Sequence, residues 1–353
     1  MTRADRVAAR VAERELNAVV VTNIVNVRYL SGYTGSNGIC VVGPDLRLFF
    51  TDFRYVAQAA EQVPDTFERM EGKRDLLGDV AERLHGRVGF EDASLTVRRY
   101  ERLRELVGDR AELVAAGNLV EELRMVKEPD EIHAIRSAAR LADQALEAVL
   151  TRGLLGRSER EVALDLESEM RARGADDVAF PSFVASGAHG ALPHAEPRDE
   201  EIAARTLVTI DWGAMVDGYC SDCTRTFATG ELDGEMSAAY EVVLDAQQKS
   251  EAAVRAGEAG KDLDGIARSE IVAAGHGDHF GHGLGHGVGL EVHEEPRLSQ
   301  VSEDTLVPGN VVTVEPGVYV PGRFGIRIED LVVVTEDGCE VLSGLPKELL
   351  TVG

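Results

Sequence analysis

The stretch LVTIDWGAMVDGYCSDCTRTF, residues 207–227, predicts a β-hairpin and decides the fold around it. Its two β-rich runs flank Asp217-Gly218, a dipeptide that favours a two-residue turn between paired strands. With that turn, residues whose numbers add up to 435 face each other, so Asp211 lies opposite Thr224. Asp222 is two residues from Thr224 and therefore shares its face, diagonal to Asp211. The hairpin thus places two carboxylates on one side of a buried strand pair.

Such a pair of buried carboxylates is unfavourable unless a positive charge compensates it. The hairpin alone leaves two interpretations open. Either the pair binds a cation, or one carboxyl group is protonated or both reach solvent at a sheet edge.

A glycine-rich segment with several histidines favours the first interpretation. Seven of the nine histidines lie beyond residue 188, and five fall between His276 and His293. In GHGLGHGVG, residues 281–289, alternating glycines let the backbone pack closely and leave imidazoles facing a site. The segment does not match a phosphate-binding loop, because neither Gly-Lys-Ser/Thr nor a Gly-x-Gly-x-x-Gly spacing is present.

A third segment, VVTVEPGVYVPGRFGIRIEDL at residues 311–331, carries glutamates inside apolar runs. Its two strands are joined by a Pro/Gly turn region, and Pro316 favours an extended conformation at Glu315. By strand alternation Arg327 and Glu329 share one face, so we expect the Arg327 guanidinium to support the Glu329 carboxylate.

These segments together predict a site for two metal ions. The acids Asp211, Asp222, Glu315 and Glu329 carry four negative charges, which two divalent cations would neutralise, and His286 adds a neutral nitrogen ligand. Because carboxylates dominate, Mn²⁺ is the first expectation, with Co²⁺ or Zn²⁺ as alternatives. A solvent molecule between two such ions becomes a hydroxide near neutral pH, a nucleophile for carbonyl carbon. The sequence therefore predicts a dinuclear metallohydrolase.

Composition sets the surroundings in which such a site works. The 353 residues include 37 basic and 62 acidic side chains, a net charge of −25. That charge argues against nucleic acid or an anionic membrane as a partner. No apolar run approaches the roughly 20 residues of a membrane span, and residues 1–15 lack the apolar region of a signal peptide. The four scattered cysteines, Cys40, Cys220, Cys223 and Cys339, predict reduced thiols in the cytoplasm.

The chain divides into two predicted domains. Residues 1–122 alternate strands and helices as a compact α/β domain. Strands are expected at residues 18–22, 38–42 and 46–51, and further helices and strands at 53–62, 75–85, 87–90, 96–107 and 111–115. Residues 123–353 change to long helices, the first expected to start at Glu131, followed by long strands, an α+β pattern. Residues 152–163 and 256–267 share a Gly-x-x-Gly joint between helices at an offset of 104, which predicts an internal repeat. The alternative is that this joint is merely a common helix–helix connection.

The ordered set Asp211, Asp222, His286, Glu315 and Glu329 resembles the ligand pattern of the pita-bread metallopeptidases. Residues 191–195 (ALPHA), 289–294 (GLEVHE) and 325–330 (GIRIED) resemble the Xaa-Pro branch of that superfamily, which includes prolidase and aminopeptidase P. Residues 29–36 (YLSGYTGS) and 51–55 (TDFRY) are similar to the creatinase-like domain that precedes it. The resemblance covers essentially the whole chain. It implies a creatinase-like α/β domain followed by a pita-bread catalytic domain with a pseudo-twofold repeat.

The resemblance also implies a role for each residue. Asp211 would bind one metal, His286 and Glu315 the other, and Asp222 and Glu329 would bridge both. Glu315 would also move the proton of the attacking water. His194 and His293 would contact the scissile peptide, with His293 at the carbonyl oxygen. Substrate binding would involve His282 and Arg327 on the proline side, while Thr224 would support the ligands. The motif at residues 293–297 separately places Arg297 near the mouth of the site, where it either binds substrate or is a plain surface charge.

Three functions remain in competition. The first is hydrolysis of the Xaa-Pro bond of short peptides, either in dipeptides, where Arg297 would bind the free carboxylate, or in longer peptides as in aminopeptidase P. The second is a catalytically inactive binding protein, and the third a metal-free creatinase-like amidinohydrolase; retention of all five ligands argues against both. Short proline-containing peptides are therefore the expected partners, and a homodimer is common among the proteins it resembles.

Overall fold

The computed structural model describes residues 1–353, which form two compact units, Met1–Arg124 and Met125–Gly353. The boundary predicted after residue 122 lies two residues before this division. No helix is both long and apolar enough to cross a membrane.

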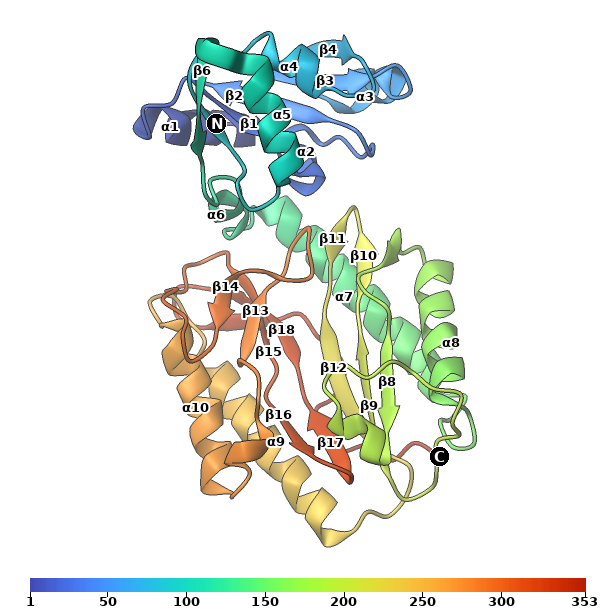
Figure 1. The fold of residues 1–353 in the computed structure, drawn as a ribbon. Helices are drawn as coiled ribbons and strands as arrows, with labels where there is room; N and C mark the ends of the chain where they lie inside the picture. Colours follow the sequence, from blue (N-terminus) through green and yellow to red (C-terminus); the bar gives the residue numbers. More distant parts are fainter. The chain divides into compact units, whose positions relative to one another are not determined.

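The N-terminal unit is built on a six-stranded mixed sheet in the order β4-β3-β2-β1-β5-β6 (Figure 1). The central strand β1 is buried along its whole length and pairs antiparallel with β2 and parallel with β5. Its strands are β1 (Ala18–Val21), β2 (Ile39–Gly43), β3 (Leu46–Asp52), β4 (Glu68–Gly72), β5 (Gly86–Phe90) and β6 (Ala111–Ala115). The predicted strand pairs around residues 18–22, 38–42 and 46–51 are confirmed.

Helices α1 (Arg3–Glu13), α4 (Leu77–Ala81) and α5 (Val97–Val107) pack apolar residues against this sheet or its core. The first begins at a capping box, in which Thr2 accepts from the Asp5 amide, and buries Val7 and Val11. The helices are α1 (Arg3–Glu13), α2 (Ile24–Ser31), α3 (Val56–Gln62), α4 (Leu77–Ala81), α5 (Val97–Val107) and α6 (Glu121–Arg124), with a 3₁₀ turn η1 (Gly108–Arg110). The sequence analysis missed α2 and β4, because α2 has little amphipathic pattern and β4 is mostly exposed.

The C-terminal unit has four long helices with the strands between them (Figure 1). They are α7 (Pro129–Leu150), α8 (Glu159–Ala172), α9 (Gly234–Ala253) and α10 (Gly260–Ala273), with 3₁₀ turns η2 (Gly187–Ala191) and η3 (Gly277–His279). Pro129 occupies the first helical position of α7, where its missing N–H removes no helical hydrogen bond, so the helix begins two residues before the predicted start at Glu131.

Thirteen strands complete this unit. They are β7 (Asp177–Val178), β8 (Phe183–Ser186), β9 (Leu207–Trp212), β10 (Ala214–Val216), β11 (Tyr219–Cys220), β12 (Cys223–Ala228), β13 (Gly285–Gly287), β14 (Glu294–Leu298), β15 (Val311–Val314), β16 (Gly317–Val320), β17 (Phe324–Arg327), β18 (Asp330–Val334) and β19 (Cys339–Val341). The sheets run in the orders β12-β9-β8, β11-β10-β7, β14-β13-β15-β18-β19 and β16-β17.

The internal repeat is visible in the order of these elements. The first half, residues 129–228, runs α7, α8, β8, β9, β12, and the second half, residues 234–334, runs α9, α10, β13, β15, β18. In each half the three strands form an antiparallel sheet with the middle strand of the sequence at its centre. Each half also has its own hydrophobic core, one gathered around Trp212 and the other around Phe324.

The predicted register of the deciding hairpin is confirmed. Val216 pairs with Tyr219, and further along Asp211 pairs with Thr224. Asp217 and Gly218 both have positive φ angles, 51° and 77°, as the tight turn between these strands requires.

Candidate metal centre

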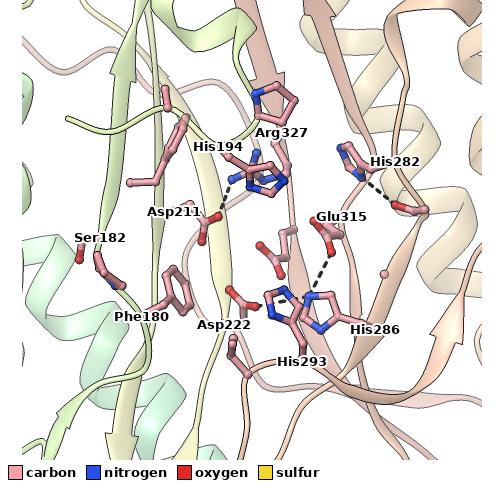
Figure 2. A pocket seen from close by; sticks show the side chains of 18 of the residues that line it. Phe180, Ser182, His194, Asp211, Asp222, His282, His286, His293, Glu315 and Arg327 are labelled. Atoms are coloured by element: carbon pink, nitrogen blue, oxygen red, sulfur yellow. Dashed lines mark hydrogen bonds and ion pairs between the residues drawn. The ribbon is translucent and has the colours of Figure 1, made fainter. Parts of the chain in front are cut away.

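The largest concentration of chemically active side chains lines one cavity of about 620 Å³ in the C-terminal unit. Both halves contribute to its lining, and Figure 2 shows carboxylates and imidazoles pointing toward one another within it. All the residues expected to bind metal or substrate lie on its wall: His194, Asp211, Asp222, His282, His286, His293, Arg297, Glu315, Arg327 and Glu329. The chain thus brings together side chains that are up to 135 residues apart in the sequence, from His194 to Glu329.

Three carboxylates form the centre of the cluster. One oxygen atom from each of Asp211, Asp222 and Glu329 lies within 4.8 Å of the others. Asp211 is near the end of β9, Asp222 immediately precedes β12, and Glu329 immediately precedes β18. The backbone joins the two halves here, since the Glu329 amide donates to the Thr224 carbonyl at 3.0 Å.

His286 and Glu315 complete the set from the second half. His286 Nδ1 lies 3.0 Å from the Gly287 carbonyl, which can only accept, so Nδ1 donates and Nε2 is left to face the cluster. Nε2 lies 3.3 Å from Glu315 Oε1 and 3.6 Å from Asp222 Oδ2. All five residues of the expected ligand set therefore converge.

The pKa values of the four clustered acids are shifted in different directions. Burial raises the pKa of Asp222 and of Glu329 well above the usual range, and the neighbouring carboxylates raise it further. Burial also raises the pKa of Asp211, against the opposing effect of Arg327. Burial would raise the pKa of Glu315 as well, but the neighbouring His286 and the nearby positive charge lower it below the ordinary value. The pKa values of three of the four acids are thus raised, and added positive charge would favour their ionised form.

The donor atoms left over fit divalent cations. Asp211 Oδ1 and Glu329 Oε1 are buried and have no hydrogen-bond partner. An orphaned buried oxygen is costly, and a cation would satisfy it. Four carboxylates with one imidazole nitrogen form a donor set suited to hard or borderline ions. The residues present therefore fit the metal ions that the sequence predicts.

Arg327 bonds directly to another carboxylate than Glu329. Its guanidinium donates from Nη2 to Asp211 Oδ2, and Nε donates to the Thr224 hydroxyl at 3.0 Å. Because β17 ends at Arg327 and β18 begins at Asp330, alternation within one strand does not extend to Glu329. The charge of Arg327 nevertheless opposes the rise in the pKa of Glu329 that burial causes, which agrees with the expected support.

Two threonine hydroxyls hold the carboxylates from behind, in the same manner. Thr224 Oγ1 accepts from Arg327 Nε and donates to Glu329 Oε2 at 2.7 Å. Thr313 Oγ1 accepts from the His286 amide at 3.0 Å and donates to Glu315 Oε1 at 3.2 Å. Sequence reasoning found Thr224 through the hairpin register but missed Thr313, whose position two residues before Glu315 on the same strand face was the available signal.

A chain of hydrogen bonds lines the side of the cavity near His282. Arg327 Nη1 donates to the Tyr319 hydroxyl at 3.0 Å, and that hydroxyl lies 2.9 Å from His282 Nε2. His282 Nδ1 donates to the Gly283 carbonyl at 2.8 Å, so Nε2 accepts from Tyr319. Burial lowers the pKa of His282, which agrees with a neutral ring in this chain. Tyr319 was not identified from the sequence.

The remaining cavity residues are more exposed. The His293 ring lies 4.3 Å from that of His286, measured between centroids, and burial together with His286 lowers the pKa of His293 to about 4. Arg297 pairs with His286 across β13 and β14, so both side chains belong to one face of the sheet. Its Nε lies 3.7 Å from Glu295. His194 is exposed on the loop after η2 (Figure 2).

A buried ion pair lies behind the carboxylates. Arg225 is 1% exposed and donates to Asp330 Oδ1 at 2.6 Å and to the Glu329 carbonyl. The Cys223 thiol lies 3.3 Å from the same carbonyl, and burial raises the pKa of this thiol well above its usual value. These contacts fix the backbone of Glu329, and they could not be predicted from local sequence patterns.

Comparison with known families agrees with this geometry. Residues 133–336 match the model of metallopeptidase family M24, and residues 3–126 match the creatinase/prolidase N-terminal domain. The chain belongs to metallopeptidase family M24 and carries the N-terminal domain found in creatinase and prolidase. The predicted fold, a creatinase-like domain followed by a pita-bread domain, is thereby confirmed.

Individual relatives extend over nearly the whole chain. An Xaa-Pro dipeptidase from Pyrococcus furiosus is 37% identical over 96% of this chain and 96% of its own length. An Xaa-Pro dipeptidase from Bacillus anthracis has a similar structure, with a TM-score of 0.95 and 38% identity over 99% of both chains. An X-Pro aminopeptidase from Thermotoga maritima superimposes with a TM-score of 0.89 at 37% identity, covering 97% of this chain and 99% of its own.

Proposed function

We propose that this protein is a metal-dependent peptidase that hydrolyses the Xaa-Pro bond of dipeptides. The observation that carries the proposal is the convergence of four carboxylates and His286 in one cavity of a family M24 chain. The names of the relatives in both comparisons support Xaa-Pro substrates. The same convergence argues against an inactive binding protein, which has no need for a costly group of buried acids.

In this proposal Asp211 would hold one metal ion, His286 and Glu315 would hold a second, and Asp222 and Glu329 would serve both. When bound, divalent cations supply positive charge at the substrate carbonyl and lower the pKa of a coordinated water near neutral pH. Mn²⁺ is proposed because carboxylates dominate the donor set, with Co²⁺ or Zn²⁺ as alternatives. Elemental analysis of the protein as purified tests this choice.

Glu315 is placed to handle the proton. Its carboxylate lies on the cavity wall beside His286, where it can accept a proton from the water that attacks the scissile carbonyl. The Xaa-Pro bond is a tertiary amide, and its nitrogen must be protonated as the C–N bond breaks. We propose that Glu315 returns the proton to that nitrogen.

The histidines surround the peptide in this proposal. His293, neutral at physiological pH because its pKa is lowered to about 4, donates a hydrogen bond to the carbonyl oxygen as negative charge develops there. His194 contacts the scissile peptide from the opposite loop. His282 and Arg327 form the wall on the proline side, although the Arg327 guanidinium already has three partners within the protein, Asp211, Thr224 and Tyr319.

Arg297 distinguishes the two Xaa-Pro activities. A dipeptide ends in a free carboxylate, which a guanidinium can bind in a fork-like pair. Arg297 lies on the cavity wall, on the same sheet face as His286, and its contact with Glu295 is 3.7 Å, so this exposed side chain can reorient toward a substrate. The alternative is an Xaa-Pro aminopeptidase, in which a longer peptide would extend through this end of the cavity. The similarity to the X-Pro aminopeptidase from Thermotoga maritima favours considering this alternative.

The test compares hydrolysis of Ala-Pro and Ala-Pro-Ala by protein stripped with a chelator and reloaded with Mn²⁺. Preferential cleavage of Ala-Pro supports the dipeptidase. Arg297→Ala should then reduce Ala-Pro hydrolysis far more than Ala-Pro-Ala hydrolysis, and Arg297→Lys, which keeps the charge without the fork, should fall between. Efficient tripeptide cleavage and equal losses for both substrates would favour the aminopeptidase, and failure to cut either peptide after confirmed metal loading would remove both.

We also propose that the protein works in the cytoplasm. All four cysteines are free, which suits a reducing compartment. Cell fractionation with an antibody against the protein tests the location, and light scattering of the purified protein tests whether it forms the homodimer that the resemblance implies.

A further inference from the structure

Glu159 is a fully buried acid that the proposed chemistry does not use. It is the first residue of α8, after the N-cap Ser158, and its exposed fraction is 0%. A carboxylate at a helix N-terminus is favoured by the helix dipole. Burial opposes ionisation, but hydrogen bonds from the Ser186 and Arg198 amides outweigh it, so the pKa of Glu159 lies below its ordinary value.

The two oxygens of this carboxylate bind two separate points of the chain. Oε1 accepts from the Ser186 amide at 2.8 Å and from the Ser186 hydroxyl at 2.9 Å. Oε2 accepts from His189 Nδ1 at 2.8 Å and from the Arg198 amide at 3.1 Å. Backbone bonds reinforce the arrangement, because the Arg160 amide donates to the Arg198 carbonyl at 3.0 Å. Glu159 therefore connects Ser186, at the end of β8, to Arg198, where the following loop returns to α8.

The loop between these two points is the one that carries His194. Residues 193–197 all line the cavity, and His194 itself is exposed. Figure 2 shows the His194 ring on the same side of the cavity as Arg327 and Asp211. Because the side chain is exposed, its position depends on how the two ends of its loop are held, and Glu159 holds both.

We propose that Glu159 is the positioning residue that fixes the His194 loop against the cavity. The proposal rests on the proposed peptidase function for the role of His194, while the anchoring itself is independent of it. No neutral side chain can replace this carboxylate fully, since donors converge on both of its oxygens and an amide would direct an N–H toward one of those groups.

The second half contains a comparable arrangement at α10. Asp264 is also 0% exposed and accepts from the Leu284 amide at 3.0 Å. It also holds Arg268, which donates to the Phe280 and His282 carbonyls at 2.9 and 2.8 Å. A buried acid near the start of α8 and of α10 thus anchors a segment that bears a cavity histidine. Substitution of Asp264 would therefore remove a similar anchor near His282.

The first experiment measures kcat and KM for Ala-Pro with Glu159→Gln and Glu159→Ala, alone and combined with His194→Ala. Displacement of a catalytic group by about 1 Å typically costs ~10²-fold in rate. Glu159→Ala should therefore lower kcat/KM by ~10–10²-fold with unchanged metal content, Glu159→Gln should lose less, and either loss should nearly vanish when His194 is already alanine. Asp165→Asn, which weakens ion pairs of α8 with Arg152 and Arg157 away from the cavity, should leave kcat/KM unchanged. Asp264→Asn should keep its full effect when combined with His194→Ala.

The second experiment does not require peptidase activity. Hydrogen exchange of residues 186–198 should accelerate at least tenfold in Glu159→Ala and less in His189→Ala, which removes only one donor and preserves the carboxylate. Faster exchange without any catalytic effect would retain the anchor and remove the peptidase role of His194. Unchanged exchange in both variants, or a kcat/KM loss of the same size with and without His194, would overturn the proposal.

Discussion

The two halves of the C-terminal unit build their parts of the metal centre differently, although their elements follow the same order. In the second half, His286 lies across the strands from Thr313 and supplies a nitrogen beside Glu315. The corresponding pair in the first half is Ala185 opposite Thr209, and it has no imidazole. Asp211 relies instead on Arg327, a residue that comes from the second half.

This difference explains which carboxylates depend on metal ions. Glu315 has His286 beside it and its pKa is lowered, whereas burial raises the pKa of Asp211, Asp222 and Glu329. The duplicated scaffold thus lowers the pKa of one acid and raises the pKa values of three, and cations would favour the ionised form of those three. The acid with the lowered pKa is the one proposed to move the proton.

The largest expected effect comes from the two acids proposed to serve both metal ions. Asp222→Asn and Glu329→Gln should each remove both ions and lower activity by more than the ~10²–10³-fold typical of losing one oxyanion donor. Asp211→Asn should remove one ion, because this acid is assigned to a single metal. Elemental analysis decides the matter, and two ions retained in Asp222→Asn would contradict the bridging assignment.

The histidines of the two halves should differ in importance. His293→Ala should lower kcat by ~10²–10⁴-fold, because it removes the group proposed to stabilise the developing oxyanion. His194→Ala should lose less, since its loop is exposed. Steady-state kinetics on metal-loaded protein measures both, and near-normal turnover of His293→Ala would exclude that residue from the mechanism.

The two threonines provide a matched pair behind the ligands. Thr224→Val and Thr313→Val should each weaken metal affinity by ~10–100-fold, as is usual when the partner of a ligand is lost. Thr224→Ser and Thr313→Ser keep the hydroxyl and should retain affinity. Competition with a metal-binding dye gives the constants. A larger loss for Thr224→Val would follow because the Thr224 hydroxyl accepts from the Arg327 side chain, whereas that of Thr313 accepts from a backbone amide. No loss in either valine variant would show that the hydroxyls are dispensable.

The smallest expected effect concerns stability rather than catalysis. Asp143 on α7 corresponds, at the repeat offset of 104, to Gln247 on α9, and burial raises the pKa of Asp143 to about 6. The folded state therefore binds this proton more tightly than the unfolded state does. Its contribution to stability is present below pH 4 and is lost as pH rises toward 6.

Asp143→Asn should remove that dependence and be more stable than the wild type above pH 6 by about 1–3 kcal/mol. Its side-chain oxygen can still accept from the Gly344 amide, which donates at 2.6 Å in the wild type. Urea unfolding from pH 4 to 7 measures the difference. Gln247→Glu, which places an acid beside Asp330, should introduce a similar dependence in the other half, and parallel curves for all three proteins would refute the comparison.

The hairpin could be predicted from sequence because a two-residue turn fixes register at once, and the register then places Asp222 and Thr224 on one face. The same alternation did not predict the direct partner of Arg327, because two short strands, not one, lie around it. Thr313 could have been found by alternation from Glu315. Tyr319 and Glu159 were beyond local patterns, since their partners are set by how loops and strands meet in three dimensions. In the sequence, Glu159 looks like any acid at the start of a helix, because its partners Ser186 and Arg198 are distant along the chain.

The buried thiol of Cys223 can be used to detect opening of the structure around the carboxylate cluster. Thiol reagents attack the thiolate, and burial raises the pKa of Cys223 well above its usual value and that of the partly exposed Cys339 to about 11. Modification of Cys223 therefore has to wait until β12 separates from Glu329. The rate of thiol modification thus measures how often β12 separates from Glu329. Slower modification in the presence of divalent ions would show that the ions hold these two segments together.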